Sequence, residues 1–216
     1  MIDLKQLRRE YGQLSLLENT VYTDPFEQFA LWFNSALKAA IKDANAMVLS
    51  TVDAAGYPDS RVVLLKEWNA QGFVFFTHYQ SHKGQQLAQN PRAALNFYWT
   101  EFSRQIRIRG EVEKITAEES AAYFNSRSLG SQASAAALQQ SSPIPNRQAL
   151  LDAVNVVEKK YAKKPIPCPT EWGGYRLVPE EFEFFQGRNE RLHDRLHFFK
   201  VKDATMVEWE YERLAP

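Results

Sequence analysis

Residues 182–187 read Phe182-Glu183-Phe184-Phe185-Gln186-Gly187, and residues 191–195 read Arg191-Leu192-His193-Asp194-Arg195. Aromatic residues are typical of β-strands and a following glycine favours a turn, so the first segment predicts a strand ending at Gly187. If the second segment is also extended, alternation puts Arg191, His193 and Arg195 on one face. Two guanidiniums and an imidazole would then converge on a ligand above that face. The alternative is a solvated loop closed by ion pairs to Asp194.

The composition is that of an ordinary globular protein. The chain has 216 residues, of which 44% are hydrophobic and 13% aromatic, far from disordered or collagen-like composition. Lys+Arg and Asp+Glu each number 26, so no overall charge favours nucleic acid or an acidic membrane surface. Any site for an anion must therefore be a local cluster of cations.

The sequence predicts a cytoplasmic protein. The first residues, Met1-Ile2-Asp3-Leu4-Lys5, contain no apolar signal region, and no stretch approaches the roughly 18 to 20 apolar residues that span a bilayer. Cys168 is the only cysteine, which excludes an internal disulfide and a zinc site built from cysteines.

We expect residues 1–22 to form a flexible arm and residues 23–216 to form a single domain. The polar arm is centred on Arg8-Arg9-Glu10-Tyr11. Asp24, followed by Pro25 and then Glu27, is typical of a helix start. Phe residues at three- and four-residue spacing predict an amphipathic helix that extends to about Asp43.

Short β-type runs and helical patterns alternate through the remainder. Strands are expected over 47–52, 62–65, 73–77, 93–99, 104–115, 174–178, 182–185, 196–201 and 206–211, and helices over 82–89, 117–127, 131–138 and 147–162. The run Val62-Val63-Leu64-Leu65 is apolar throughout, which predicts a strand buried on both faces. The turn at 69–72 joins it to the next strand as a hairpin. No internal repeat or long linker is present, so the pattern predicts one antiparallel, barrel-like α+β domain.

No common catalytic motif or metal-ligand spacing is present, and none of the four histidines, His78, His82, His193 and His197, forms a convincing metal site. What the sequence offers is cations and hydroxyls near expected strand ends. They are Arg61, Lys66, Thr77, Ser81, Lys83, Arg127, Ser131, Ser141, Arg191 and Arg195. This set suits two phosphate groups better than one.

A series of motifs resembles the pyridoxine/pyridoxamine 5′-phosphate oxidase family, in order from about Arg8 to the last residue. The motifs are Arg61-Val62-Val63-Leu64-Leu65-Lys66, Phe76-Thr77, Ser81-His82-Lys83, Arg104-Gln105, Tyr123-Phe124, Ser126-Arg127, Ser131-Gln132, Gln140-Ser141-Ser142, Trp172-Gly173-Gly174, Arg191 to Arg195, and Glu212-Arg213-Leu214-Ala215-Pro216. One such block is weak evidence, whereas the ordered set is specific.

The resemblance implies an FMN-binding split barrel, a homodimer with two FMN sites at the subunit interface. It implies oxidation of pyridoxamine 5′-phosphate or pyridoxine 5′-phosphate to pyridoxal 5′-phosphate, with O2 as acceptor. From one subunit FMN would be bound by Arg61, Val62, Val63, Leu64, Leu65, Lys66, Phe76, Thr77, His82 and Lys83. From the other subunit it would be contacted by Gln105, Gln140, Ser141, Phe185 and Arg195.

The resemblance also implies a substrate site. The substrate phosphate would be held by Lys66, Tyr123, Arg127 and Ser131, and the pyridine ring would lie against Arg191, Leu192 and His193. Arg191 and His193 are the expected catalytic residues. Arg8, Arg9, Glu10 and Tyr11 of the arm would cover the site.

Some positions depart from the family pattern. Phe185 stands where tryptophan is usual, Phe76 where tyrosine is usual, and His82 where arginine is usual, while Ser128 and Ser134 occupy positions near Ser131 where proline and glycine are expected. These changes leave two alternatives open. One is a different split-barrel flavin oxidoreductase acting on another reduced heterocycle, and the other is a non-catalytic protein that binds pyridoxal 5′-phosphate.

The spacing of Arg61 and Lys66 poses a geometric problem. Five residues of extended strand span about 16 Å, long enough to serve both ends of an elongated ligand. An odd separation puts the two side chains on opposite faces unless a bulge or strong twist intervenes.

Overall fold

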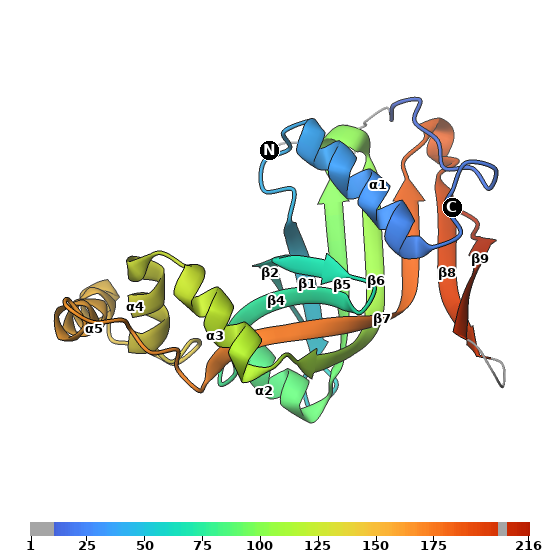
Figure 1. The fold of residues 1–216 in the computed structure, drawn as a ribbon. Coiled ribbons are helices and arrows are strands. Elements are labelled where there is room, and N and C mark those ends of the chain that lie inside the picture. Colours follow the sequence, from blue (N-terminus) through green and yellow to red (C-terminus); the bar gives the residue numbers. More distant parts are fainter. Residues whose placement is uncertain (1–10, 203–206) are drawn as a thin grey trace, which may run out of the picture. The chain divides into compact units, whose positions relative to one another are not determined.

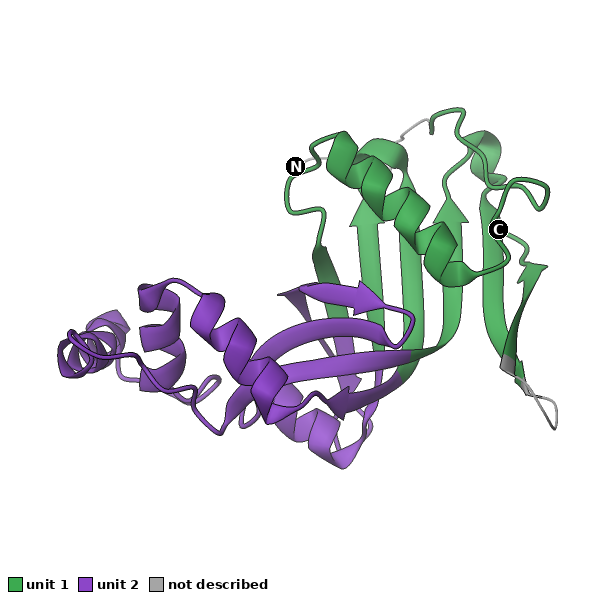
Figure 2. Cartoon of the chain, viewed as in Figure 1, with its two compact units in different colours: residues 1–49, 94–110, 179–216 green, residues 50–93, 111–178 purple. Residues whose placement is uncertain are grey.

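The computed structural model describes residues 11–202 and 207–216, and the chain divides into two compact units (Figure 2). Unit 1 comprises Met1–Leu49, Ala94–Gly110 and Pro179–Pro216, and unit 2 comprises Ser50–Ala93 and Glu111–Val178. Each unit is therefore assembled from segments far apart in the sequence. None of the described helices is long and apolar enough to cross a membrane.

The strands form one mainly antiparallel sheet (Figure 1). They are β1 Ala46–Val52, β2 Pro58–Leu64, β3 Glu67–Asn69, β4 Gly72–His78, β5 Arg92–Trp99, β6 Arg104–Lys114, β7 Trp172–Gln186, β8 Asp194–Lys202 and β9 Val207–Arg213. Hydrogen-bonded neighbours follow the order β2-β1-β5-β6-β7-β4-β3, with β8 pairing β7 and β9 pairing β8. The pairs β3–β4, β4–β7, β7–β8 and β8–β9 are all antiparallel, as the sequence predicts.

In unit 1, helix α1 (Pro25–Lys38) covers one face of the strands. Its N-terminus is capped by Asp24, which accepts a hydrogen bond from the Phe26 amide, as predicted. Trp32 packs edge-on against Phe184 of β7, and Phe29 is fully buried. The helix ends at Lys38 rather than near residue 43, because Ala40 has a left-handed backbone conformation with φ 51°, which an α-helix cannot continue.

Unit 2 carries the remaining α-helices, which are α2 His82–Gln89, α3 Ala117–Ser126, α4 Leu129–Ala137 and α5 Arg147–Lys160. All four predicted helices are present. Polar residues cap them, and Thr116 and Glu119 form a reciprocal capping box at the start of α3. A small core of Phe124, Ala133 and Trp172 joins α3 and α4 to the start of β7.

The prediction that residues 62–65 form a strand buried on both faces is wrong. Val62 is 65% exposed and Leu64 41% exposed, whereas Leu65 is buried. β2 is the first strand in the sheet order, so no described strand pairs with its outer edge. An apolar run predicts burial on both faces, but the side chains of a strand at the edge of its sheet can remain exposed.

Two further predictions about strands need correction. The hairpin before β4 is present, but its first strand is β3, in which Asn69 pairs with Gly72. The two strands expected over 174–178 and 182–185 are one strand, β7. Pro179 lies between the stretch that pairs with β4 and the stretch that pairs with β8, and an extended backbone accommodates its fixed φ.

The extended geometry expected for residues 191–195 is also wrong at its start. Asn189–Arg191 forms a short 3-10 turn, and Glu190 and Arg191 have φ values of 57° and 64°. The strand β8 begins only at Asp194. Because the backbone reverses at Arg191, strict alternation does not place it on the same face as Arg195.

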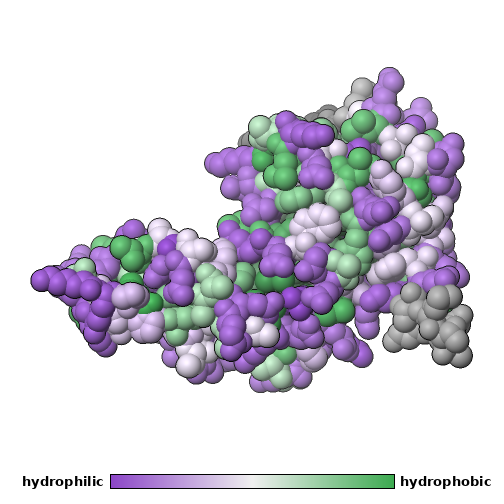
Figure 3. All heavy atoms as spheres, viewed as in Figure 1, coloured by the Kyte–Doolittle hydropathy of each residue, from purple (hydrophilic) through white to green (hydrophobic). Residues whose placement is uncertain are grey.

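Hydrophilic side chains are spread over the face drawn in Figure 3 and are interrupted by smaller hydrophobic areas. This mixture agrees with the balanced charge of the sequence. The features that bear on function are therefore local clusters of side chains rather than one charge spread over the whole surface.

A substitution at Gly84 tests how closely α2 packs against the backbone of Tyr79. A Cβ atom at this position would overlap the backbone carbonyl oxygen of Tyr79. We expect Gly84→Ala to lower the free energy of unfolding by about 2 kcal/mol, because the clash with backbone outweighs the better helix propensity of alanine. Urea unfolding measures this change. Gly130→Ala in α4 is the matched control, because no heavy atom lies within 4 Å of its added Cβ, and it should not destabilise the chain.

Candidate functional site

Unit 2 contains a pocket of about 1020 Å³. Its walls come from β2, β4, α3, α4, the segment after α4 and the start of β7. The lining residues are Arg61, Val62, Val63, Leu64, Lys66, Phe76, Thr77, His78, Lys83, Tyr123, Arg127, Ser128, Ser131, Ser134, Ala135, Leu138, Gln139, Gln140, Ser141, Ser142, Ile144, Leu150 and Trp172. Pockets for small molecules and cofactors commonly have a comparable volume.

The pocket is strongly cationic. Arg61, Lys66, Lys83 and Arg127 line it, and no aspartate or glutamate is found among its lining residues in the described part of the chain. Asp59, which does not line the pocket, pairs with Arg61, so four lining cations leave an excess of positive charge that favours an anionic ligand.

Lys83 is the most buried of these cations, with 8% of its surface exposed. Its Nζ donates to Gln140 Oε1 at 3.0 Å and to Thr77 Oγ1 at 3.3 Å. Burial, followed by the nearby charge of Arg61, lowers the pKa of Lys83 to about 8. An anion beside Nζ would relieve both effects, so the position is suited to a phosphate.

Arg61 lies on β2, where neighbouring side chains orient its guanidinium. It forms an ion pair with Asp59, and its Nη1 donates to Thr51 Oγ1 at 2.6 Å. Gln86 of α2 accepts a further bond from Nη2 at 3.2 Å. The guanidinium is therefore fixed in place beside Lys83, which gives a rigid pair of cations at this end of the pocket.

Arg127 lies at the C-terminus of α3 and has a buried donor without a partner. Its guanidinium stacks over Trp172 at 4.9 Å, and its Nη1 is buried with no hydrogen-bond partner in the part of the chain that the structure describes. Burial lowers the pKa of Arg127. Buried donors are normally satisfied, so this orphaned N–H marks a second place where a ligand oxygen fits the pocket. Ser131 lines the pocket close by in sequence.

Three aromatic rings form one wall of the pocket. Phe76 stacks on Tyr123 with ring centroids 3.9 Å apart, and on Trp172 at 5.4 Å. Lys66 Nζ lies 6.0 Å from the centre of the Tyr123 ring. A flat apolar wall between groups of cations suits a planar ligand that carries phosphate.

The structure brings most of the predicted unit 2 residues together. Arg61, Val62, Val63, Leu64, Lys66, Phe76, Thr77, Lys83, Tyr123, Arg127, Ser131, Gln140 and Ser141 all line the pocket. Leu65 is buried and does not line the pocket, and His82 is exposed at the start of α2, where its backbone N–H donates to Ser141 Oγ. Arg61 and Lys66 reach the same pocket because β2 ends at Leu64, so strand alternation no longer applies at Lys66.

Gln140 and Ser141 line the pocket of their own chain. The resemblance implied that both reach FMN from the other subunit. In this chain Gln140 accepts hydrogen bonds from Thr77 and Lys83 of the same pocket. The segment after α4 carries them there, a long-range contact that no local sequence pattern indicates.

The other predicted residues belong to unit 1. His193 lies between two aromatic rings, with Tyr11 at 5.0 Å and Phe185 at 4.9 Å between ring centroids. Leu192 is 66% exposed. Arg195 pairs with Glu183 at 2.9 Å and faces Phe185 in the β7–β8 register.

Two further placements complete the predicted set. Gln105 donates to Asn96 Oδ1 at 2.8 Å. Arg8, Arg9 and Glu10 lie outside the described residues.

Sequence reasoning gave no role to several polar residues of the site. Asp59, Thr51 and Gln86 orient Arg61, and Trp172 supports Arg127. Only Trp172 carried a usable signal, as part of the motif Trp172-Gly173-Gly174. The others contact Arg61 from positions 2, 10 and 25 residues away in the sequence, and they are polar residues of kinds that are common on any surface.

The fold and this pocket define a split-barrel protein with a cationic small-molecule site. The structure is similar to that of PhzG from Burkholderia lata in complex with tetrahydrophenazine-1-carboxylic acid, with a TM-score of 0.86 and 28% identity over 95% of this chain and 100% of that chain. It is also similar to a pyridoxamine 5′-phosphate oxidase-related, FMN binding protein from Nostoc punctiforme, with a TM-score of 0.71 and 18% identity, covering 89% of this chain and 98% of that chain. The second likeness shows the fold alone.

The chain belongs to the pyridoxamine 5′-phosphate oxidase family, since residues 33–161 match the family described as "Pyridoxamine 5'-phosphate oxidase". Residues 172–216 match the "Pyridoxine 5'-phosphate oxidase C-terminal dimerisation region". A pyridoxine/pyridoxamine 5′-phosphate oxidase from Legionella pneumophila strain Paris is 51% identical over 99% of this chain and 97% of the relative. A relative of the same name from Ralstonia pickettii is 47% identical over the full length of both.

Proposed function

We propose that the protein is an FMN-dependent oxidase that converts pyridoxamine 5′-phosphate or pyridoxine 5′-phosphate to pyridoxal 5′-phosphate. Oxygen is the acceptor and hydrogen peroxide a product, with ammonia released from the amine. The proposed setting is synthesis or salvage of vitamin B6 in the cytoplasm. The observation that carries the proposal is the excess of positive charge in the pocket, which four cations line, and the buried Nη1 of Arg127, which has no hydrogen-bond partner among the described residues.

The residues present fit FMN. Arg61 and Lys83 form a rigid cationic pair for its phosphate, supported by Thr77 and Gln140, and the exposed apolar side chains of Val62 and Leu64 on β2 suit a flat ring system. FMN supplies, when bound, a two-electron acceptor that oxygen can reoxidise. The match to a dimerisation region supports a homodimer, in which Gln105, Phe185 and Arg195 are proposed to complete the FMN site.

The protein's own contribution to the reaction is to place the substrate. Lys66, Tyr123, Arg127 and Ser131 are proposed to hold the substrate phosphate through charge-assisted hydrogen bonds. Anchoring one end of a small rigid molecule fixes the carbon to be oxidised and lowers the entropic part of the barrier.

Arg191 and His193 are proposed to contact the pyridine ring. His193 Nδ1 accepts a hydrogen bond from the Arg188 backbone N–H at 3.0 Å, so only its Nε2 is available to the substrate. Burial, followed by the charge of Arg191, lowers the pKa of His193, which keeps the ring neutral near pH 7. We therefore assign His193 the role of a hydrogen-bond donor to the substrate rather than that of an obligatory base.

A second candidate function has a specific observation in its favour. PhzG, which is 28% identical, was solved in complex with tetrahydrophenazine-1-carboxylic acid, a reduced heterocycle without phosphate. An oxidase for such a molecule would use the aromatic wall, and the anionic group it could offer to Arg127 is a carboxylate rather than a phosphate. The 51% identity to a named pyridoxine/pyridoxamine 5′-phosphate oxidase favours the phosphorylated substrate.

Flavin spectroscopy tests the proposal. The purified protein, loaded with FMN, should lose its visible absorption when pyridoxamine 5′-phosphate is added under nitrogen and regain it in air. Bleaching by reduced phenazine carboxylates alone would support the second candidate. A protein that FMN does not reconstitute would refute both and leave the non-catalytic binding role.

A further inference from the structure

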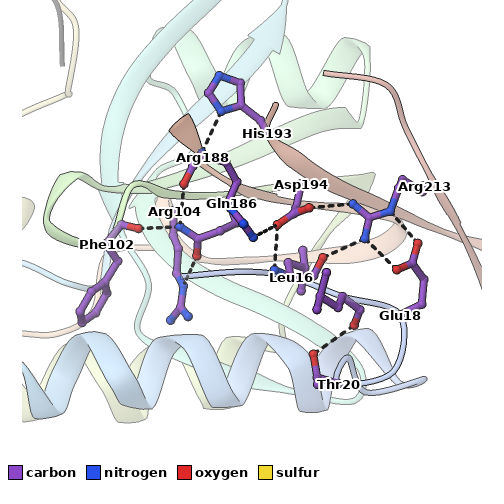
Figure 4. Close-up of polar contacts among 12 residues, drawn as sticks. Leu16, Glu18, Thr20, Phe102, Arg104, Gln186, Arg188, His193, Asp194 and Arg213 are labelled. Atoms are coloured by element: carbon purple, nitrogen blue, oxygen red, sulfur yellow. Dashed lines mark hydrogen bonds and ion pairs between the residues drawn. The ribbon is translucent and has the colours of Figure 1, made fainter. Parts of the chain in front are cut away.

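The loop of residues 187–193, which carries Arg191 and His193, is anchored at both ends within unit 1 (Figure 4). At its start Gln186 is fully buried. The Gln186 side chain accepts a bond from Arg104 Nε at 2.9 Å and donates to the Phe102 carbonyl oxygen at 2.9 Å. This fixes the point where β7 gives way to the loop.

At the other end of the loop Asp194 is the central acceptor. It is 8% exposed and accepts three hydrogen bonds (Figure 4). Its Oδ1 accepts from Arg213 Nη1 at 2.9 Å, and its Oδ2 accepts from the Leu16 backbone N–H at 3.1 Å and from Arg188 Nη1 at 3.2 Å. A buried carboxylate satisfied by three donors from three segments is a rigid anchor.

Arg213 of β9 extends this anchor to the N-terminal segment. Its Nε and Nη2 bind the two carboxylate oxygens of Glu18 at 2.6 and 2.8 Å, and Nη2 also donates to the Leu16 carbonyl oxygen at 2.9 Å. Four of the five N–H donors of the guanidinium are thus engaged, with Asp194 on one side and Glu18 on the other. Residues 16–18 are thereby held against the base of the loop.

Arg188 connects the anchor to His193. Its guanidinium binds Asp194, and its backbone N–H donates to His193 Nδ1. Because a backbone N–H can only donate, Nδ1 must be unprotonated, and the neutral ring carries its proton on Nε2. Tyr11 and Phe185 pack against the same ring and restrict its rotation.

We propose that Asp194 is a positioning residue for His193. By holding the Arg188 guanidinium, it keeps the Arg188 backbone N–H against Nδ1 and so presents His193 as an Nε2–H donor. Arg213 and Glu18 support it by holding the other side of the carboxylate. The identity of the molecule that receives this donor rests on the proposed function, whereas the tautomer is a property of the chain without FMN or substrate.

Nitrogen-15 NMR of the histidine-labelled FMN-free protein is the direct measurement. Protonated and unprotonated ring nitrogens have well-separated shifts, and His193 is assigned by its loss in His193→Gln. We expect the natural chain to show the Nε2–H form. Asp194→Asn keeps the shape, but its NH2 group must face one of the guanidinium or amide donors, so we expect a mixture of tautomers and exchange broadening.

Kinetics of the FMN-loaded protein give a second readout. A misplacement of His193 by a fraction of an ångström to 1 Å should lower kcat about 10- to 100-fold. KM for pyridoxamine 5′-phosphate should change little, because the proposed phosphate contacts lie elsewhere. Failure of the natural chain to oxidise any B6 phosphate would refute the proposed function and leave the NMR test of Asp194 intact.

A second variant, Arg188→Met, tests the same contact in case Asp194→Asn fails to fold. It keeps the Asp194–Arg213 pair and the backbone N–H, and its side chain is 36% exposed. It should reproduce the mixed tautomers, and the double variant should be no worse than the worse single variant, because both act through one contact. Glu210→Gln, an exposed carboxylate on β9, should leave both readouts unchanged. A His193 that keeps the Nε2–H form in Asp194→Asn and Arg188→Met would overturn the proposal.

Discussion

Lys83→Met is expected to bind FMN about 100-fold more weakly than the natural chain. A hydrogen bond from a buried ammonium to a phosphate contributes up to about 3 kcal/mol, and each 1.4 kcal/mol is about tenfold in affinity. Lys83 is also held by Thr77 and Gln140, so little entropy is lost when a ligand arrives. Quenching of flavin fluorescence measures the affinity. Lys159→Met on the exposed surface of α5 removes the same charge and should leave FMN affinity nearly unchanged.

The affinity for FMN should also depend on pH in a defined direction. Lys83 has a pKa of about 8 in the free protein, and an adjacent phosphate raises it. Between about pH 7 and pH 8 the ammonium is mostly charged with or without FMN, and the phosphate, whose second pKa is about 6, stays dianionic, so the affinity changes little. Above pH 8 the free protein has lost the proton and binding must restore it, so Kd rises by up to about tenfold per pH unit. Lys83→Met should abolish this slope, and an unchanged slope would remove Lys83 from the site.

Local sequence rules predicted most elements of the fold, because those elements are stabilised locally. Asp24 and Thr116 cap α1 and α3 through short-range hydrogen bonds. Ile106 and Ile108 alternate with polar residues and are fully buried in β6. The mainly antiparallel split barrel implied by the ordered motifs is confirmed.

The errors fall where the outcome depends on contacts between distant segments. Val62 looks like a core residue by its neighbours, but β2 is the outermost strand of its sheet path. Arg191 looks extended, yet its φ is 64° because the loop is anchored at Gln186 and Asp194. The bond from Leu16 to Asp194 joins residues 178 positions apart, and no periodicity in either segment indicates it.

In the candidate site, too, sequence motifs predicted some residues, whereas residues that act through contacts between segments were not predicted. Motif order placed Arg61, Lys66, Thr77 and Lys83 in one set, and the structure places all four in one pocket. The roles of Gln86 and Asp59 in orienting Arg61 could not be predicted, since polar residues of this kind are common on any surface. Sequence therefore named the cations of the pocket but not the residues that hold them.

Arg127→Met is expected to lower kcat/KM for pyridoxamine 5′-phosphate about 100-fold. The unpaired, buried Nη1 of Arg127 is proposed to gain its partner only when the substrate phosphate binds, so the natural chain gains a charge-assisted bond of up to about 3 kcal/mol that the variant lacks. Trp172 supports the guanidinium by stacking at 4.9 Å, and methionine can fill the same space without the charge. Stopped-flow reduction of the flavin measures the loss.

Comparing substrates with and without phosphate shows where the loss arises. Pyridoxamine lacks the phosphate, so Arg127→Met should oxidise it about as slowly as the natural chain does, and the preference for the phosphorylated substrate should fall by the same factor as kcat/KM. Arg92→Met removes an exposed cation of unit 2 outside the pocket lining and should keep the full preference. Arg191→Ala provides the contrast, because it should lower turnover while FMN remains bound and the phosphate preference persists.

The preference for phosphate also separates the two candidate functions. If Arg127 instead bound the phosphate of FMN, Arg127→Met would weaken FMN binding and lower the rates with both substrates equally. If the natural substrate placed no anionic group beside Arg127, the variant would retain its turnover, because the guanidinium would then contact no substrate group. A buried N–H of Arg127 without a hydrogen-bond partner destabilises the ligand-free chain. A phosphate that accepts a hydrogen bond from this N–H removes that cost on binding, and the donor then has a function.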